Sequence, residues 1–309
     1  SAWAVVNPNR ADCRYPDKAI AGCMVSWLVM SFLRQRLIDQ GVLVPTTPKL
    51  GDLLDYVALG TVADCVSLGS SETNRRPGHM NEGAVSTRLG VDGTPGIAEE
   101  VMIARDILLA EYTGGHVHVA HISTAEGVDL VRKAKAKGIP VTTEVCPHHF
   151  HLTDEEVEKT NFSTNVKMHP PLRTQHDVDA MIEGLKDGTI DVICTDHAPH
   201  AIEEKEVEFN YAPNGIIGLE TAWAITNERL FAPGHLSLTS LIDKLCDQPR
   251  KILRLEVPQI APGSLANLTI FNTDERWVFD DKNVRSKSHN SPYLNRNMTG
   301  RAVAIVNKG

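Results

Sequence analysis

The chain has 309 residues, of which 42% are hydrophobic and 23% are charged. These values are typical of a soluble globular protein with two or more domains and a sizeable core, and they exclude a mainly disordered chain. The net charge is −8, from 39 acidic and 31 basic side chains, and the sequence contains no long basic run. Composition therefore does not favour nucleic acid as a partner.

The six cysteines lie far apart, and no Cys-x-x-Cys pair occurs. We therefore expect neither a disulfide scaffold nor a zinc site of paired thiolates, and we predict a cytoplasmic protein with reduced thiols. The longest uncharged apolar stretch, residues 19–33, is shorter than the ~20 residues of a membrane span, which predicts a buried helix and no membrane partner. Because the sequence begins with Ser1, the first element is expected to be a fragment.

Residues 1–76 differ in composition from the rest of the chain. All 13 histidines lie at or after His79, and a Gly- and Ser-rich run ends at Arg76. We place a domain boundary near Arg76. Before it, the pattern predicts a turn-rich entry, a long apolar helix to about Gln40, a Pro-rich loop and a second apolar run.

From Pro95 onward the sequence alternates between helical and extended patterns. Acidic residues at 99 and 100 suit the start of a helix, whose apolar residues are Ile97, Val101, Ala104 and Leu108. Strands are predicted at 116–122, 140–146 and 189–195, with helices between them. Strands that alternate with helices imply parallel βαβ units, so the predicted fold class is α/β. Short β-rich runs after Gly263 predict a small closing β-domain.

Each predicted strand is followed by side chains of the kinds that bind metals or move protons. These are His121, then His148 and His149, then Asp196 and His197. In (β/α) barrels the chemistry lies at the carboxyl ends of the strands. We therefore expect His121 and Asp196 to lie at one rim, close enough to share an ion, since zinc favours nitrogen and carboxylate ligands.

The densest group, residues 195–200, has a structural alternative, in which Asp196 caps the next helix and the histidines lie on the surface. His116 and His118 share one strand face and could chelate a metal, although histidines within strands are more often held by packing and hydrogen bonds. Residues 165–173 combine a double proline with cationic side chains and are predicted either to hold a substrate carboxylate or to form a plain surface turn.

Several of these motifs occur in the order found in one family. They are Met80-Asn81-Glu82-Gly83 and residues 118–124, 144–149, 165–173, 196–200 and 218–221. Residues 77–309 therefore resemble class I dihydroorotases, the zinc amidohydrolases of pyrimidine biosynthesis, without their N-terminal part. The resemblance implies a partial (β/α)8 (TIM-type) barrel over residues 77–262 and a small β-rich domain over residues 263–309.

The resemblance also implies roles for individual residues. His121 would be a zinc ligand, and Asp196 would bind the metal and move the proton as the ring opens or closes. His200 would contact the substrate, as would His169, which stands where the family has an asparagine, and Asn214 and Gly215, where the family has a bulky residue before the glycine. The implied reaction is the reversible cyclisation of N-carbamoyl-aspartate to dihydroorotate, with zinc activating water.

Two of the family's ligand sources, an early His-x-His-x-Arg strand and a mid-barrel lysine or aspartate, have no counterpart in this sequence. Residues 1–76 instead resemble the RecJ-like single-strand exonucleases of the DHH phosphoesterases, an α/β family. Residues 7–9, 15–22 and 59–64 carry this similarity, which places Asp64 at a metal-ligating aspartate position. The segment contains no histidine, so it lacks the Asp-His-His signature itself.

Three functions are therefore compatible with the sequence. The first is a dihydroorotase-like hydrolase with zinc as cofactor, for which hydantoinase and allantoinase are sister activities. The second is a DHH-type phosphoesterase acting on nucleic acid, and the third is an inactive, chimeric fusion or artefact. For the first, the expected partners are a small-molecule substrate, carbamoyl-aspartate or dihydroorotate, and a second copy of the chain in a homo-oligomer.

Overall fold

The computed structural model describes residues 38–40 and 78–307. Several predictions lie outside these residues: the apolar helix at 19–33, the RecJ-like segment with Asp64, and the boundary near Arg76.

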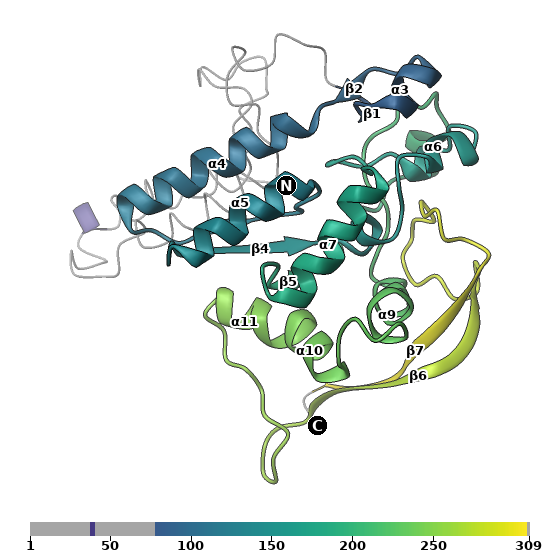
Figure 1. Cartoon of the computed structure of the whole chain (residues 1–309). Coiled ribbons are helices and arrows are strands. Elements are labelled where there is room, and N and C mark those ends of the chain that lie inside the picture. The colour runs from purple at the N-terminus through teal and green to yellow at the C-terminus, as the bar shows by residue number, and fades with distance from the viewer. Residues whose placement is uncertain (1–37, 41–77, 308–309) are drawn as a thin grey trace.

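A three-stranded parallel sheet forms the centre of the described fold, in the order β3 (Val117–Val119), β4 (Val141–Val145) and β5 (Val192–Ile193). Its strands are joined by α5 (Ala125–Ala136) and α7 (Gln175–Asp187), so the predicted βαβ units are confirmed. Helices α4 (Gly96–Thr113), α5 and α7 lie side by side along one face of the sheet (Figure 1).

Local signals fix the ends of these helices. The hydroxyl of Thr124 accepts a hydrogen bond from the amide of Gly127 at 3.1 Å, which caps α5. At the start of α7, the backbone amide of Thr174 donates to the carboxylate of Asp177 at 3.1 Å in a capping box. Helix α4 ends at Gly114, whose φ of 69° is the left-handed conformation that glycine adopts at little cost.

Helix α4 is correctly predicted, but it is turned differently from what its apolar spacing suggested. Ile97, Val101 and Leu108 are exposed, and the helix instead buries Ile103, Ile107 and Ala110. Both sets recur at helical spacing, because the helix is apolar on more than one side. The spacing therefore identified the helix but not the side that faces the core.

Short elements surround this centre. A parallel pair, β1 (Met80–Asn81) and β2 (Gly93–Thr94), brackets α3 (Ala84–Leu89). The remaining short helices and helical turns are η2 (Pro147–Phe150), α6 (Glu156–Lys159), η3 (Thr164–Val166), α8 (Ile202–Lys205), α9 (Ala222–Thr226), η4 (Asn227–Phe231), α10 (Leu238–Ile242), η5 (Asp243–Asp247) and α11 (Gln248–Ile252).

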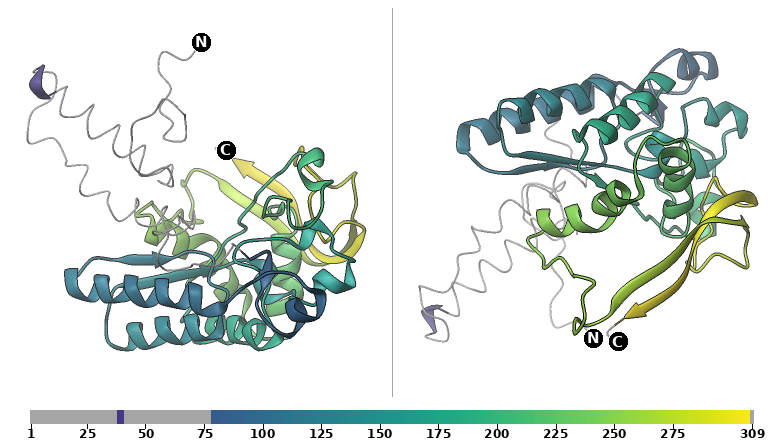
Figure 2. Two further views of the ribbon diagram at one scale, coloured as in Figure 1. Left: turned by 90° about the horizontal axis from the view of Figure 1, so that it is seen from above. Right: turned by 60° about the horizontal axis from the view of Figure 1, so that its bottom comes forward.

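The C-terminal part forms one long antiparallel pair, β6 (Asn267–Phe279) and β7 (Arg296–Asn307). This curved ribbon packs against α9 (Figure 2). The β-rich character predicted for residues 263–309 is thus present as a two-stranded sheet, and a separate domain there stays a prediction. Among the described residues, no helix is both long enough and apolar enough to cross a lipid bilayer.

Candidate active site at the strand ends

The two residues on which the sequence argument depends leave their strands in the same unusual conformation. His121 follows β3 with a φ of 52°, and Asp196 follows β5 with a φ of 44°. Residues other than glycine enter this left-handed region at an energetic cost, and such residues cluster at functional sites. The backbone at both strand ends is therefore held in a costly shape by its surroundings.

His121 and Asp196 meet, as the sequence predicted. Nε2 of His121 lies 3.7 Å from Oδ1 of Asp196, and the two side chains are 15% and 30% exposed. The prediction that these groups lie at one rim is confirmed. A site between them is both sheltered and open to solvent.

A carboxylate that the sequence analysis did not single out lies between the histidines. Glu144, at the end of β4, places Oε1 3.0 Å from Nδ1 of His121 and Oε2 3.4 Å from Nε2 of His118. Burial alone would raise the pKa of Glu144, but the hydrogen bonds with His118 and His121 outweigh burial and hold the pKa well below its usual range. Burial likewise lowers the pKa of His121, yet its hydrogen bonds with Cys194 and Glu144 raise it to about 11.

The two strand histidines, His116 and His118, are bound to a hydroxyl group. The Oγ1 atom of Thr142 lies 3.0 Å from Nε2 of His116 and 2.8 Å from Nδ1 of His118. The alternative of hydrogen-bonded strand histidines therefore describes this pair, and the metal-chelating interpretation is not supported. Strand alternation could have revealed Glu144, because residues 142, 144 and 146 share one face of β4.

The paired histidines after β4 are buried and neutral. His149 donates from Nε2 to the carbonyl of Pro170 at 2.9 Å, and burial lowers its pKa to about 3. Burial also lowers the pKa of His148 well below its usual value. Nε2 of His148 is buried without a hydrogen-bond partner among the described residues. A buried, unpaired imidazole nitrogen is costly unless something else fills the position.

Two cysteines complete the strand ends. Cys146 follows β4 and Cys194 follows β5, and their sulfur atoms lie 3.4 Å apart. Both sulfurs face Nδ1 of His121, at 3.6 and 3.5 Å. The sequence analysis missed this group, because the two cysteines are 48 residues apart in the chain and only strand pairing brings them together.

The residues predicted to contact substrate gather around one turn. His200 donates from Nε2 to the carbonyl oxygen of Asn214 at 2.8 Å. The side-chain amide of Asn290 donates to the carbonyls of Ala198 and Gly215, at 2.9 and 3.1 Å. His200, Asn214 and Gly215 therefore form one fixed unit beside the end of β5.

Two further histidines, His169 and His197, differ in their surroundings. His169 is exposed and lies within electrostatic range of Asp196 and His121. Nδ1 of His197 accepts hydrogen bonds from the amides of Gly218 and Leu219, at 3.1 and 3.4 Å. His197 therefore holds the chain after β5 in place, whereas His169 is accessible from solvent.

The cations of residues 165–173 are not available to a substrate. Arg173 is 3% exposed, and its guanidinium binds Ser123, Asn81 and the carbonyl of Thr94. Lys167 donates to the carbonyls of Asn210 and Ala212, at 3.0 and 2.8 Å. The interpretation of this stretch as a carboxylate clamp is therefore wrong for its two cations, which stabilise the fold instead.

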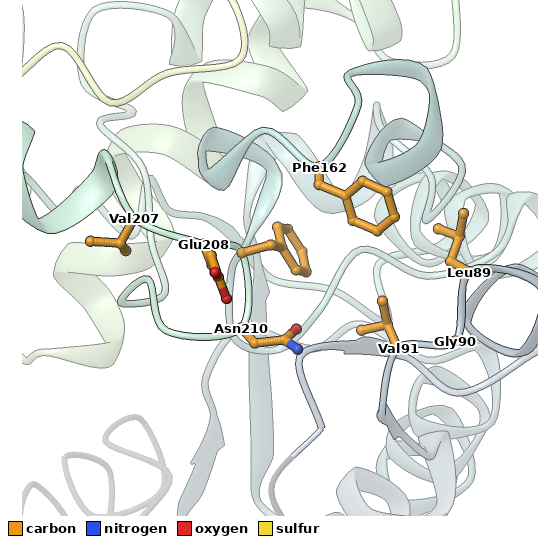
Figure 3. Close-up of a pocket in the computed structure, with 8 residues that line it drawn as sticks. Leu89, Gly90, Val91, Phe162, Val207, Glu208 and Asn210 are labelled. Atoms are coloured by element: carbon orange, nitrogen blue, oxygen red, sulfur yellow. The ribbon is translucent and has the colours of Figure 1, made fainter.

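A hollow of about 450 Å³ lies away from these residues, between α3 and the loop after α8. Leu89, Val91 and Phe162 surround it, together with the segment from Val207 to Asn210 (Figure 3). None of the residues that line the hollow was predicted to act in catalysis or substrate binding. The candidate chemistry is thus at the strand ends and not in this hollow.

Two donors at the strand ends are of the kinds that bind zinc. Nε2 of His121 and a carboxylate oxygen of Asp196 face each other. His148 belongs to a separate group with Cys146 and His149, whose ligand atoms lie within 4.8 Å of one another. Zinc in catalytic sites is ordinarily held by three such nitrogen and oxygen ligands. His121 and Asp196, the two residues that the sequence analysis assigned as ligands, would supply two of them.

Comparison with known proteins identifies the family of the chain. A model of the family described as "Amidohydrolase family" matches residues 87–296. The dihydroorotase of Ruminiclostridium cellulolyticum is 54% identical over 216 residues, which are 70% of this chain and 50% of that protein. The dihydroorotase of Endomicrobium trichonymphae is 45% identical over 269 residues, which are 87% of this chain and 63% of that protein. The match to the Endomicrobium trichonymphae protein covers more residues than the stretch 77–309 contains, so it includes part of the segment before residue 77.

Solved structures show a similar fold. The L-hydantoinase (dihydropyrimidinase) from Arthrobacter aurescens is 28% identical with a TM-score of 0.64, covering 71% of this chain and 49% of that one. The dihydropyrimidinase from Brevibacillus agri is 25% identical with a TM-score of 0.63, covering 70% and 48%. The chain thus spans about half the length of these relatives.

Proposed function

Because this chain belongs to the amidohydrolase family, we propose that it contributes the active site of a dihydroorotase-like cyclic amidohydrolase, which interconverts N-carbamoyl-aspartate and dihydroorotate. The observation that carries the proposal is the 3.7 Å approach of Nε2 of His121 to Oδ1 of Asp196 at neighbouring strand ends. The similarity to dihydroorotases selects this substrate from the cyclic amides that the family hydrolyses.

His121 and Asp196 would hold the zinc ion. When bound, the ion would polarise the ring amide and make water a stronger nucleophile. Glu144 prepares His121 for this task, since it accepts a hydrogen bond at Nδ1 and leaves Nε2 directed toward Asp196.

Asp196 is the group that moves the proton. In ring opening, its carboxylate takes the proton from the attacking water and delivers it to the ring nitrogen that leaves the carbonyl carbon. In ring closure the same carboxylate takes the proton from the ureido nitrogen as that nitrogen bonds to the carboxyl carbon, and delivers it to the oxygen that leaves this carbon as water. Its side chain is partly exposed, so it can face both the ion and a substrate in the opening.

The turn around Asn214 would orient the substrate. His200 is fixed by its bond to the Asn214 carbonyl, and Gly215 lies so close to Ala198 that a side chain at this position would clash with it. His169 is positioned to contact the polar edge of a ligand. We also propose a cytoplasmic location, where the three cysteines of the described part, all free, would stay reduced. A homo-oligomer stays a prediction.

The test is turnover of dihydroorotate by the 309-residue chain with added zinc, beside the Asp196→Asn variant. We expect ring opening by the native sequence and none by the variant, whose side chain cannot accept the proton. Hydantoin and allantoin serve as competing substrates. Faster hydrolysis of either would replace dihydroorotase by that sister activity, and equal turnover by Asp196→Asn would refute the assigned role.

A further inference from the structure

Three metal-binding atoms converge on the side of His121 that faces away from Asp196. They are the sulfurs of Cys146 and Cys194 and Nδ1 of His121, and they come from the ends of three neighbouring strands. Cys146 is fully buried and Cys194 is partly buried. The strand pairing that places Val145 opposite Ile193 makes the two cysteines neighbours, so the arrangement follows from the fold and not from loop conformation.

The spacing of these atoms is that of a metal site. With bonds of about 2.3 Å to sulfur and about 2.0 Å to nitrogen, a tetrahedral ion separates two sulfurs by about 3.8 Å and a sulfur from a nitrogen by about 3.5 Å. The observed separations are 3.4 Å between the sulfurs and 3.6 and 3.5 Å from sulfur to Nδ1. Shifts of a few tenths of an ångström would therefore admit an ion.

We propose that Cys146, Cys194 and Nδ1 of His121 form a binding site for a thiophilic divalent cation. Two thiolates and one imidazole favour soft or borderline ions such as Cd²⁺ and Zn²⁺ over Mg²⁺ or Ca²⁺. Binding forms two metal–sulfur bonds and one metal–nitrogen bond. It releases to the buffer the two thiol protons and the proton on Nδ1.

An ion at this site would bind Nδ1 of His121, whereas the proposed zinc ion would bind Nε2 of the same ring. Glu144 can accept the Nδ1 proton of His121 only while no ion occupies Nδ1. Occupation of both nitrogens by cations would require the ring to lose its last proton, which places two positive ions across one imidazole. A thiophilic ion therefore competes with the ion beside Asp196. The proposal itself rests on the sulfur and nitrogen positions and not on the proposed hydrolase activity.

The experiment uses the full chain in which the other four cysteines are serine, so that only Cys146 and Cys194 can supply sulfur. Cd²⁺ is titrated, and the ultraviolet absorption of thiolate-to-cadmium charge transfer is recorded. We expect one equivalent to bind with this absorption. Replacing either Cys146 or Cys194 by serine should abolish it, whereas restoring the exposed Cys246 should leave it unchanged.

X-ray absorption at the cadmium edge gives a second readout that requires no change at the site. In the chain whose other four cysteines are serine, we expect the bound cadmium to have two sulfur neighbours. A spectrum with one sulfur neighbour or none would overturn the proposal. The Asp196→Asn variant separates this result from the proposed function, because it should lose hydrolysis and keep the cadmium absorption. Absorption that persists after serine replaces both Cys146 and Cys194 would also overturn the site.

Discussion

Replacing Arg173 by methionine should destabilise the fold more than any surface change. The guanidinium is 3% exposed and joins three segments: it donates to Ser123 Oγ at 3.0 Å, to Asn81 Oδ1 at 3.0 Å and to the carbonyl of Thr94 at 2.8 Å. It also pairs with Glu99, whose side chain is 15% exposed, at 3.3 Å. Methionine fills much of the volume but supplies no donor.

The expected loss in the free energy of unfolding follows from these partners. Removing one member of a buried ion pair costs about 3–5 kcal/mol, because the other charge is left uncompensated. Each acceptor left unsatisfied costs about 1–3 kcal/mol, and these contributions overlap with the first. Glu99 keeps the backbone amide of Ser123 as a donor at 2.7 Å. We therefore expect a loss of about 4 kcal/mol for Arg173→Met.

The measurement is urea denaturation of the full chain, followed by tryptophan fluorescence. A second variant, Arg173→Met with Glu99→Gln, removes the uncompensated charge and should recover about 1–2 kcal/mol. The control is Arg132→Met, which breaks a 2.8 Å pair with Asp187 whose side chains are 41% and 42% exposed. It should cost less than about 1 kcal/mol. Equal losses for Arg173→Met and Arg132→Met would refute the reasoning.

Two further predictions concern the turn that carries Asn214. Burial lowers the pKa of Lys205 to about 8 from its ordinary 10.5, so between these pH values the folded chain has lost a proton that the unfolded chain keeps. The free energy of unfolding of the native chain should therefore rise between pH 8 and 10.5, compared with that of the Lys205→Met variant. The expected rise is up to about 3 kcal/mol. A difference between the two proteins that does not change with pH would contradict this prediction. Gly215→Ala should cost about 2 kcal/mol, because the residue has a φ of 110° and the new Cβ would lie 2.5 Å from that of Ala198. Thermal unfolding would measure this loss, with Gly90→Ala as the control. At Gly90 φ is 67° and the surrounding space is open, so only the conformational cost of about 1 kcal/mol applies.

Much of the central fold could be predicted because its periodicities are unambiguous. The strands at 141–145 and 192–193 and helix α7 lie where the pattern placed them. The meeting of His121 and Asp196 followed from one rule, that the carboxyl ends of neighbouring parallel strands share an edge. In both cases local sequence and the required packing lead to the same arrangement.

The errors arise where one pattern fits two arrangements. Helix α4 has apolar residues on two sides, and only the tertiary contacts of Ile103 and Ile107 decide which side is buried. The cationic side chains of Lys167 and Arg173 suit either a ligand or the protein's own carbonyls, and charge alone does not distinguish them. The pairing of Cys146 with Cys194 depends on strand register, which no local feature of either residue reveals.

The chemistry of the site depends on how the protons of one imidazole are distributed. Glu144 lies 3.0 Å from Nδ1 of His121, whereas Asp196 lies 3.7 Å from Nε2, so the proton on Nδ1 is held more strongly. At the proposed zinc site, an ion that prefers nitrogen and oxygen ligands would therefore displace the Nε2 proton and bind beside Asp196. At the proposed cysteine site, a thiophilic ion would gain two sulfur ligands by displacing the Nδ1 proton instead. Glu144 would thus favour the ion beside Asp196, and weakening its hydrogen bond should shift metal binding toward the cysteines.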